Sequence, residues 1–385
     1  MEQESIRVGV IGLGLIAQGV HLPNLLTLRD TFTVVHVCDV SGDRARAVAD
    51  GLPGVVAAST DWMDVIADPQ VDAVLILTPG SHGDVAQAAL AAGKHVFSEK
   101  PLAYSIAEAG RIERAAADRG LVAQVGYMKM HDPIVGRARH EISRLGTLRV
   151  VRVTVLHPTD ECQFEHVNLH PSVFPDSALI ERGTRYSAQQ LVEALADSAP
   201  GVAGLYENVL LGSVIHELSL LRGLGIDLPD SFDFVSVDPL LSDPNPDGPP
   251  RIHAVAPLPN GAQLQLSWNW VPDYPEYTEE VAVFGSAGRL HLAMPGPYLP
   301  AHRAYLQVQT LDGDERSDAT HFAGHKTAFV AELEAFGRSV RHGDPVLSDV
   351  AGARIDIAVL QKMAVAAGRR EGLRAVAEVD DGSSS

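Results

Sequence analysis

A glycine-rich turn near the start of the chain constrains the fold more than any other feature of the sequence. Residues 6–11 have the pattern of an apolar strand, residues 15–28 have that of a helix, and Gly12-Leu13-Gly14-Leu15-Ile16-Ala17 lies between them. Glycines at such a turn let backbone N–H groups approach a pyrophosphate, which the positive end of the helix stabilises. The spacing G-x-G-x-x-A between a strand and a helix therefore predicts a dinucleotide-binding turn at residues 12–17.

The rest of the first third of the chain alternates short apolar runs with helical patterns. Ser105 and Glu108 have the spacing of a capping box at the start of one of these helices. Apolar strands separated by helices indicate a parallel sheet covered on both faces. We expect a doubly wound α/β domain over residues 1–126. Its later strands are expected at residues 32–38, 74–77, 95–97 and 121–125, and its helices at residues 84–92 and 105–117.

A different pattern begins near residue 127. Residues 262–270 alternate apolar and polar side chains, and residues 281–292 have the pattern of a hairpin around a glycine-rich turn. Two helical patterns with apolar stripes follow, at residues 322–340 and 355–363. Such an order is typical of a large, mostly antiparallel open sheet with one covered face. We expect this second α/β domain over residues 127–370.

The charge of the chain limits its partners. The 385 residues include 49 Asp and Glu against 30 Lys and Arg, a formal net charge of −19. Nucleic acids and anionic membranes both favour dense basic surfaces, so neither is expected as a partner. The longest apolar stretch, residues 209–226, contains His216, Glu217 and Arg222, which argues against a membrane span. We expect no signal peptide, a cytoplasmic protein, and a tail at residues 371–385.

The residue that ends the second expected strand bears on the choice of dinucleotide. Asp39 lies 22 residues after Ala17. A carboxylate at this place accepts hydrogen bonds from the ribose hydroxyls of the adenosine and repels a 2′-phosphate, so NAD is favoured over NADP. Arg44 follows shortly after and weakens that discrimination, so NADP remains an alternative.

Polar residues follow two further strands of the expected parallel sheet. Thr78-Pro79-Gly80-Ser81-His82 follows residues 74–77, and Glu99-Lys100-Pro101 follows residues 95–97. The carboxyl ends of parallel strands meet at one edge of the sheet, where ligands bind in such folds. A lysine there is placed to donate a proton or to hold a substrate hydroxyl beside a nicotinamide. An isolated Glu-Lys-Pro would by itself indicate only a surface ion pair.

Together these motifs resemble the glucose–fructose oxidoreductase, inositol dehydrogenase and rhizopine-catabolism (Gfo/Idh/MocA) family. The resemblance extends over nearly the whole chain and rests on the glycine turn with His21-Leu22-Pro23, on Glu99-Lys100-Pro101 and on Gly126-Tyr127-Met128-Lys129. It implies a Rossmann domain, a second α/β domain whose open sheet often mediates oligomers, and NAD(P)-linked redox chemistry on sugars, aminosugars or cyclitols. It also implies a homodimer or homotetramer.

The motifs and the resemblance together indicate which residues form the site. Those expected to hold the dinucleotide are Gly12, Gly14, Leu15, Ile16, Ala17, Asp39, Thr78, Pro79, His82, Glu99 and Lys100. Those expected to contact the substrate are Lys100, Tyr127, Lys129, His157, Ser213 and His216. The chemistry needs no metal, and none is expected.

A histidine on a helical segment is the second expected catalytic residue. The pattern of residues 210–218 places His216 above Gly212 and Ser213, whose small side chains leave room for a ligand. The family usually carries Asp-x-x-x-His on this helix, with the histidine as the proposed acid/base. Here the histidine is present, but Gly212 stands at the Asp position. Met130 is a second departure, because many relatives carry a cationic residue there.

The expected reaction transfers a hydride from a secondary alcohol carbon to the nicotinamide, while the alcohol proton leaves to a base. Lys100 would polarise the oxygen and His216 would take the proton, or the two roles are exchanged. Two alternatives stay open. One is a glycoside-cleaving or elimination enzyme that recycles NAD in place. The other is a non-catalytic dinucleotide-binding sensor, which the departures at Gly212 and Met130 suggest.

The region from residue 157 to residue 204 has no regular pattern. Its first part contains several residues able to bind zinc, namely His157, Asp160, Glu161, Cys162, Glu165, His166 and His170. Their spacing matches no fixed ligand pattern, so we expect a loop that lines the substrate pocket rather than a metal site. Trp268 and Trp270 lie on the apolar side of an expected strand and are predicted in the core.

Overall fold

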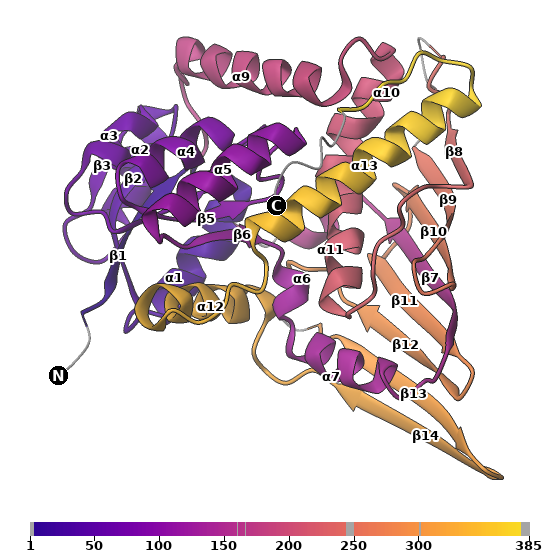
Figure 1. Ribbon diagram of the computed structural model, residues 1–385. Helices are drawn as coiled ribbons and strands as arrows, with labels where there is room; N and C mark the ends of the chain where they lie inside the picture. Colours follow the sequence, from indigo (N-terminus) through magenta and orange to yellow (C-terminus); the bar gives the residue numbers. More distant parts are fainter. Residues whose placement is uncertain (1–3, 160, 166, 244–249, 300–301, 379–385) are drawn as a thin grey trace. The chain divides into compact units, whose positions relative to one another are not determined.

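The computed structural model describes residues 4–159, 161–165, 167–243, 250–299 and 302–378 (Figure 1). The chain forms two compact units. The first comprises residues 1–128, 167–194 and 329–355, and the second comprises residues 129–166, 195–328 and 356–385. The first boundary lies close to the expected one after residue 126. Two later segments return to the first unit, however, so neither unit is one continuous stretch of chain. The last seven residues of the expected tail lie outside the described residues.

The first unit is built on a parallel sheet of six strands in the order β3-β2-β1-β4-β5-β6. This confirms the expected doubly wound sheet. Strands β1 and β4 are neighbours although β2 and β3 separate them in sequence, so the strand order reverses between them. Ligands of such sheets bind at this reversal, beyond the carboxyl ends of the strands. The strands are β1 (Ile6–Ile11), β2 (Phe32–Cys38), β3 (Ala57–Ser59), β4 (Ala73–Ile76), β5 (His95–Glu99) and β6 (Ala123–Gly126).

The helices assigned to the first unit come from all three of its segments. They are η1 (Ala17–His21), α1 (Leu22–Thr27), α2 (Gly42–Asp50), α3 (Trp62–Ala67), α4 (Gly83–Ala91), α5 (Ile106–Arg119), α9 (Ser177–Leu195) and α12 (Ala328–His342). The helix expected over residues 15–28 begins as the short π-helix η1 and continues as α1. Helix α9 was not expected at all.

Helix α12 belongs to the core of the first unit, although the strands of the second sheet precede it in sequence. The ring of Phe336 stacks on Phe32 with centroids 6.3 Å apart and meets Phe97 edge-on at 5.7 Å. Gly337 permits this close packing, because a Cβ there would lie 2.6 Å from a side-chain atom of Thr31. The expectation that the stripe of this helix begins at Phe322 is wrong: Phe322 ends strand β14 and is largely exposed.

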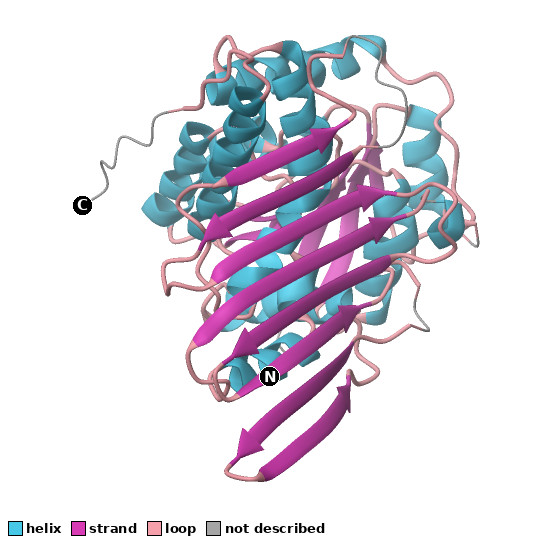
Figure 2. Cartoon of the chain, turned by 90° about the vertical axis from the view of Figure 1, so that its right-hand side faces the viewer, coloured by secondary structure: helices cyan, strands magenta, loops and turns pink. Residues whose placement is uncertain are grey.

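The second unit contains a sheet of eight strands in the order β14-β13-β12-β11-β7-β10-β9-β8 (Figure 2). Only the central pair β7 and β10 is parallel, so the expected open, mostly antiparallel sheet is confirmed. The hairpin of β13 and β14 was not expected. The strands are β7 (Leu148–His157), β8 (Phe234–Asp238), β9 (Arg251–Pro257), β10 (Gln263–Trp270), β11 (Thr278–Gly285), β12 (Gly288–Met294), β13 (Tyr305–Asp312) and β14 (Glu315–Phe322).

One face of this sheet is apolar and covered. On β10, Leu264, Leu266 and Trp268 are buried and alternate with Gln263 and Gln265, as the sequence predicts. The remaining helices are α6 (Met128–His131), α7 (Pro133–Ile142), α8 (Glu161–Phe164), α10 (Pro200–Leu205), the π-helix η2 (Tyr206–Val214), α11 (Ile215–Gly223) and α13 (Val350–Arg370), which begins in the first unit and continues in the second.

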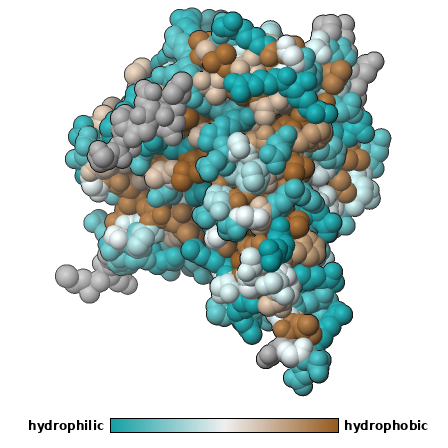
Figure 3. All heavy atoms as spheres, turned by 45° about the vertical axis from the view of Figure 1, so that its right-hand side comes forward, coloured by the Kyte–Doolittle hydropathy of each residue, from teal (hydrophilic) through white to brown (hydrophobic). Residues whose placement is uncertain are grey.

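The described part of the chain contains no helix with the length and apolarity needed to cross a bilayer. On the face shown in Figure 3, hydrophobic residues lie in groups among hydrophilic ones. Exposed apolar side chains such as Val55, Leu311 and Phe322 come from a loop and two different strands. Scattered exposure of this kind is usual for folded proteins and needs no partner to explain it.

Candidate active site

The predicted dinucleotide turn has the geometry that its glycines require. Gly12 has a φ of +90°, and a Cβ there would lie 2.8 Å from the backbone of Leu77 and Thr78, so only glycine fits. At Gly14, in contrast, a Cβ would meet no described atom within 4 Å. Residues 15–17 then begin the first helix, with Ala17 fully buried. At Gly12 the turn therefore packs against the residues that follow β4. At Gly14 it is open, and a pyrophosphate would approach there.

Asp39 lies where the sequence predicts it, at the end of β2 beside the glycine turn. Its carboxylate accepts hydrogen bonds from the backbone N–H groups of Leu13, at 3.0 Å, and Ser41, at 2.9 Å. Arg44 donates to the same carboxylate over 3.3 Å. The carboxylate is thus held in one orientation, and the neighbouring guanidinium offsets the charge that would repel a 2′-phosphate.

His82 joins the loops that follow β4 and β5. Its ring is fully buried, with Nε2 2.6 Å from the carbonyl oxygen of Thr78 and Nδ1 2.9 Å from the Ser98 hydroxyl and the Glu99 carbonyl. Burial lowers the pKa of His82 despite these hydrogen bonds, so the ring is neutral at pH 7. A ring held in this way links the loop at Thr78 to the residues Ser98 and Glu99 at the end of β5. Direct contact of His82 with the cofactor stays a prediction.

The side chain of Glu99 turns back toward the glycine turn instead of outward. One carboxylate oxygen lies 2.8 Å from Nε2 of His21, and the other accepts the backbone N–H of Lys100 at 3.2 Å. Burial acts to raise the pKa of Glu99, but the hydrogen bond and charge of His21 together with the Lys100 cation outweigh it and lower the pKa. Lys100 is therefore presented at the carboxyl edge on a backbone that Glu99 fixes.

A second glutamate completes this arrangement. Glu332 of α12 is fully buried, and neither of its carboxylate oxygens has a hydrogen-bond partner among the described residues. Burial, followed by the charge of Glu99, raises the pKa of Glu332 well above its ordinary value. One ligand atom from each of His21, Glu99 and Glu332 lies within 4.8 Å of the others, which is close enough to hold a metal ion. We call these three residues the histidine cluster; Glu332 could not be predicted from the sequence.

The irregular region of the sequence is partly regular in the structure. The expectation of an unpatterned loop is wrong for residues 177–195, which form helix α9. The face of this helix that contacts the first unit is polar: Arg182 forms two hydrogen bonds with Asp61, and Tyr186 donates to Glu108 at 2.8 Å. Asp176 caps its start, a signal that was available in the sequence. Of the residues considered for zinc, Asp160 and His166 lie outside the described residues.

In the second unit, His216 stands on α11 just after the π-helix η2. Such π-helical turns occur often at functional sites. Gly212, at the position where the family resemblance implies Asp, offers open space, since a Cβ there would meet no described atom within 4 Å. The hydroxyl of Ser213 accepts a hydrogen bond from the indole N–H of Trp268 at 2.8 Å, and its contact with substrate stays a prediction. That bond ties η2 to strand β10, where Trp268 is buried as predicted.

His157 ends β7, the strand that pairs in parallel with β10. Its ring stacks on Trp270, with centroids 4.7 Å apart and planes 15° apart, and meets Tyr277 edge-on at 5.3 Å. Trp270 is only half-buried, which departs from its predicted place in the core. The pair presents flat aromatic surface at the carboxyl ends of two parallel strands, a place suited to a small ring-shaped ligand.

Tyr127 and Lys129, both expected to contact substrate, are buried. Tyr127 is fully buried in the first unit, and Lys129 is 3% exposed in the second. The Lys129 ammonium forms a close ion pair with Glu279 and lies 3.4 Å from a carboxylate oxygen of Glu217. Tyr277 donates its hydroxyl to Glu279 at 2.7 Å. To contact substrate directly, Lys129 would have to break its ion pairs with Glu217 and Glu279.

Lys129, Glu217 and Glu279 form what we call the lysine cluster. Burial acts to lower the pKa of Lys129, but the charges of Glu279 and Glu217 outweigh it and raise the pKa. Burial raises the pKa of Glu217 to about 7; Lys129 opposes this and Glu279 adds to it. Neither glutamate could be identified from the sequence, because 88 and 150 positions separate them from Lys129.

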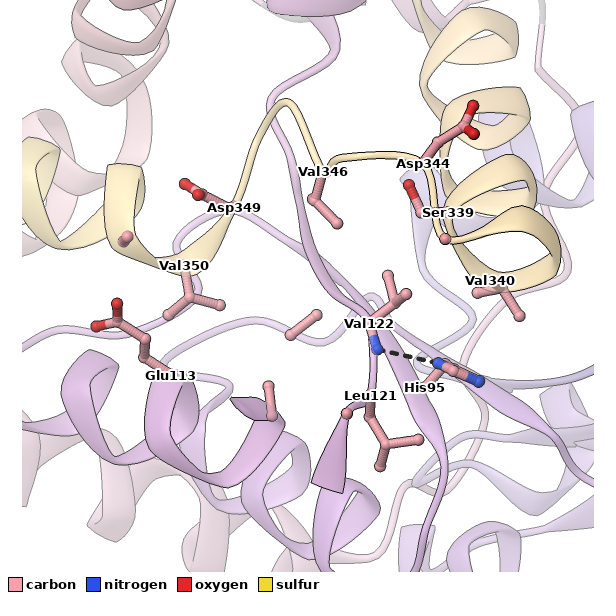
Figure 4. A pocket seen from close by; sticks show the side chains of 15 residues that line it. His95, Glu113, Leu121, Val122, Ser339, Val340, Asp344, Val346, Asp349 and Val350 are labelled. Atoms are coloured by element: carbon pink, nitrogen blue, oxygen red, sulfur yellow. Dashed lines mark hydrogen bonds between the residues drawn. The ribbon is translucent and has the colours of Figure 1, made fainter. Parts of the chain in front are cut away.

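Two cavities in the described residues lie away from the glycine turn. One of about 400 Å3, in the first unit, is lined by the first residues of β5 and β6, at the opposite edge of the sheet (Figure 4). There the N–H of Val122 donates to Nδ1 of His95 at 3.0 Å. The other, of about 270 Å3, lies in the second unit beside Tyr277 and Glu279.

Comparison with known proteins identifies the first unit. Residues 6–127 match a family described as "Oxidoreductase family, NAD-binding Rossmann fold". A scyllo-inositol 2-dehydrogenase (NAD(+)) of Bacillus subtilis (strain 168) is 37% identical over 141 residues, 36% of this chain and 41% of the relative. Inositol 2-dehydrogenase 3 of Saccharopolyspora erythraea is 41% identical over 130 residues, 33% of this chain and 38% of the relative. The chain thus spans about two fifths of the length of these curated relatives.

Solved structures share the fold over almost the whole chain. A 3-ketoreductase of Actinomadura kijaniata, in complex with TDP-benzene and NADP, superposes with a TM-score of 0.69 at 20% identity and covers 94% of this chain and 98% of its own. The UDP-N-acetylglucosamine 3-dehydrogenase of Acidithiobacillus ferrooxidans gives a TM-score of 0.66 at 22% identity, with 95% and 98% covered. Because the identities are below 25%, this similarity concerns the fold alone, and it includes both units.

Proposed function

We propose that this chain is a member of the Gfo/Idh/MocA oxidoreductase family and that it is an NAD(P)-dependent oxidoreductase acting on CH–OH groups. The observation that carries the proposal is the pairing of an NAD-family glycine turn with Lys100 at the same carboxyl edge of one sheet. The substrate class we propose is a sugar, aminosugar or cyclitol. The names of the inositol dehydrogenase relatives support the cyclitol end of that range.

The residues of the turn fit a dinucleotide. The pyrophosphate would lie at the open Gly14 and the N-terminal end of η1, and the adenosine ribose would lie at Asp39. The bound nicotinamide supplies the hydride acceptor. Because Arg44 offsets the charge of Asp39, we propose that NAD is preferred and NADP is accepted.

Two residues would handle the substrate oxygen and its proton. Lys100 would hold the oxygen by a charge-assisted hydrogen bond, which favours loss of its proton. His216 would accept that proton, or the two residues exchange these roles. The open space at Gly212 leaves His216 without the carboxylate that relatives place there. The substrate itself would then fill this space. The homo-oligomer and the cytoplasmic location remain predictions from the sequence.

The first test is nucleotide content and binding. Purified protein is denatured and any released dinucleotide is identified by mass spectrometry. The nucleotide-free protein is then titrated with NAD and NADP by thermal shift, and inositols and sugars are screened by NADH absorbance. Binding of neither dinucleotide would overturn the proposal.

The second test is substitution of the lysine. Lys100→Ala should reduce turnover by about 10³-fold, because one positioned acid/base group contributes 10²–10⁴-fold. The thermal shift that NAD produces should stay nearly intact, because the glycine turn and Asp39 would carry most of the binding. Lys362→Ala, which alters an exposed lysine of α13, is the matched control and should turn over as the wild type does. A Lys100→Ala enzyme that retains most of its turnover would remove Lys100 from the mechanism.

A further inference from the structure

A segment of the irregular region lies along the cofactor-binding edge of the first unit. Residues 167–176, which we call the strap, precede α9 and belong to the first unit. The sequence predicted that they line the substrate pocket. Their hydrogen bonds run instead to the glycine turn and to the residues that follow β2.

The first anchor of the strap is at the glycine turn. Gln18 donates its side-chain amide to the carbonyl of Leu13 at 2.7 Å and to that of His170 at 3.2 Å. Its amide oxygen accepts the backbone N–H of His170 at 2.7 Å. Val167 packs so closely that a Cβ at Gly19 would lie 3.3 Å from it. One side chain, that of Gln18, therefore bridges the dinucleotide turn and the strap.

The second anchor is beside Asp39, where the adenosine ribose would lie. Arg44 donates through Nε to the carbonyl of His170 at 3.2 Å, while its other end reaches Asp39. Ser41 exchanges hydrogen bonds with the backbone of Val173, at 2.8 and 3.2 Å. The guanidinium of Arg44 is thus held between the strap and the carboxylate predicted to bind the ribose.

Helix α9 continues from the strap and contacts the residues that follow β3 and β4. Arg182 pairs with Asp61, which follows β3, and the Ser187 hydroxyl accepts the N–H of Ser81, which follows β4, at 3.0 Å. In doubly wound sheets the pyrophosphate lies at the turn after the first strand, and the adenosine ribose lies at the acidic residue that ends the second. The strap therefore follows the course that the adenosine half would take, and α9 continues beyond it.

We propose that the strap is part of the dinucleotide site and closes over the adenosine half, with Gln18 and Arg44 as its clamps. This inference rests on the proposed dinucleotide-binding function. Bound NAD(P) leaves only after the strap opens, so nucleotide exchange is slow. Opening is feasible because hydrogen bonds at His170 and Val173 hold the strap, and Phe174 at its far end is 89% exposed.

The test is the rate at which bound NADH is displaced by excess NAD, followed by NADH fluorescence. Gln18→Met keeps the size of the side chain and removes its hydrogen bonds, so release should accelerate at least about tenfold. Gln190→Met makes the same chemical change on α9, where the amide oxygen accepts from Arg111, remote from the turn. Release from this control should match the wild type.

Hydrogen–deuterium exchange of the wild-type protein gives an independent readout and does not depend on a variant that folds. Bound NADH should slow exchange in the peptide that contains residues 167–176, at the N–H groups of His170 and Val173 above all. Unchanged exchange there, or unchanged release from a folded Gln18→Met variant, would overturn the strap proposal while NAD binding stands. Absence of binding to the wild type would instead overturn the proposed function.

Discussion

The two units each contain a cluster of two buried or largely buried glutamates, and the clusters differ in the basic side chain that accompanies them. In the histidine cluster, the carboxylate of Glu99 pairs with the imidazole of His21, and the carboxylate of Glu332 has no hydrogen-bond partner among the described residues. In the lysine cluster, a full ammonium charge lies between Glu217 and Glu279. The pKa of Glu332 is raised well above its ordinary value, whereas that of Glu217 rises only to about 7.

This difference shows how a neighbouring cation changes the pKa of a buried carboxylate. Burial penalises the charged form of every carboxylate, and a neighbouring carboxylate adds to that penalty. The ammonium of Lys129 opposes the effect of burial on Glu217, so the pKa of Glu217 is raised only to about 7. The carboxylate of Glu332 has no hydrogen-bond partner among the described residues, and its pKa is raised well above the ordinary value.

The largest loss of stability should follow from removal of the Lys129 ammonium. Lys129→Met leaves Glu217 and Glu279 buried without a compensating charge, so the free energy of unfolding should fall by about 3–5 kcal/mol. Urea denaturation at pH 7 measures this loss of unfolding free energy. Arg137→Met on α7 is the control, because Arg137 is half-exposed and its partner Glu141 also pairs with Arg144. Its loss should stay below about 1 kcal/mol, and equal losses in the two variants would contradict the comparison.

The contrast between the units also explains what sequence reasoning could find. The glycine turn, Asp39 and Glu99-Lys100 are local signals, in which a motif and its neighbouring strand are read together, and their positions at one sheet edge follow from the parallel topology. Hydrophobic periodicity finds faces buried by apolar side chains, so it could not detect α9, whose contact face carries Arg182 and Tyr186.

Partners far apart in the sequence were equally out of reach. Lys129 has the sequence context of a ligand-binding cation, and only the fold brings Glu217 and Glu279 to it. Helix α12 has an ordinary apolar stripe, but nothing in the stripe says which of two sheets it covers. Its glutamate, Glu332, reaches His21 and Glu99 only because α12 returns to the first unit.

The second prediction concerns pH in the lysine cluster. The pKa of Glu217 is about 7 in the folded protein and near 4.5 when unfolded, so the folded state binds this proton more tightly. The stability it contributes is complete below about pH 4.5 and is lost as the pH rises to about 7, a change of about 3 kcal/mol at most. Glu217→Gln has no such proton. The stability of the variant relative to the wild type should therefore rise over this pH range and level off above it.

Urea denaturation of both proteins at a series of pH values checks this second prediction. The exposed pair of Arg251 and Asp238 supplies a control, because Asp238→Asn should shift stability little and without a step near pH 7. A relative stability of Glu217→Gln that stays flat from acid to neutral pH would show that Lys129 already holds Glu217 ionised.

The third prediction separates the two clusters most sharply. Glu332 also binds its proton more tightly when folded, but its pKa lies well above the ordinary value, and its carboxylate accepts no hydrogen bond from the described residues. The stability from this proton is full below about pH 4.5 and continues to fall as the pH rises through the folded pKa, by about 1.4 kcal/mol per pH unit. The stability of Glu332→Gln relative to the wild type should thus keep rising above pH 7, where that of Glu217→Gln levels off. Parallel curves for the two variants would mean that Glu332 ionises as readily as Glu217, and that the lysine is not what distinguishes the clusters.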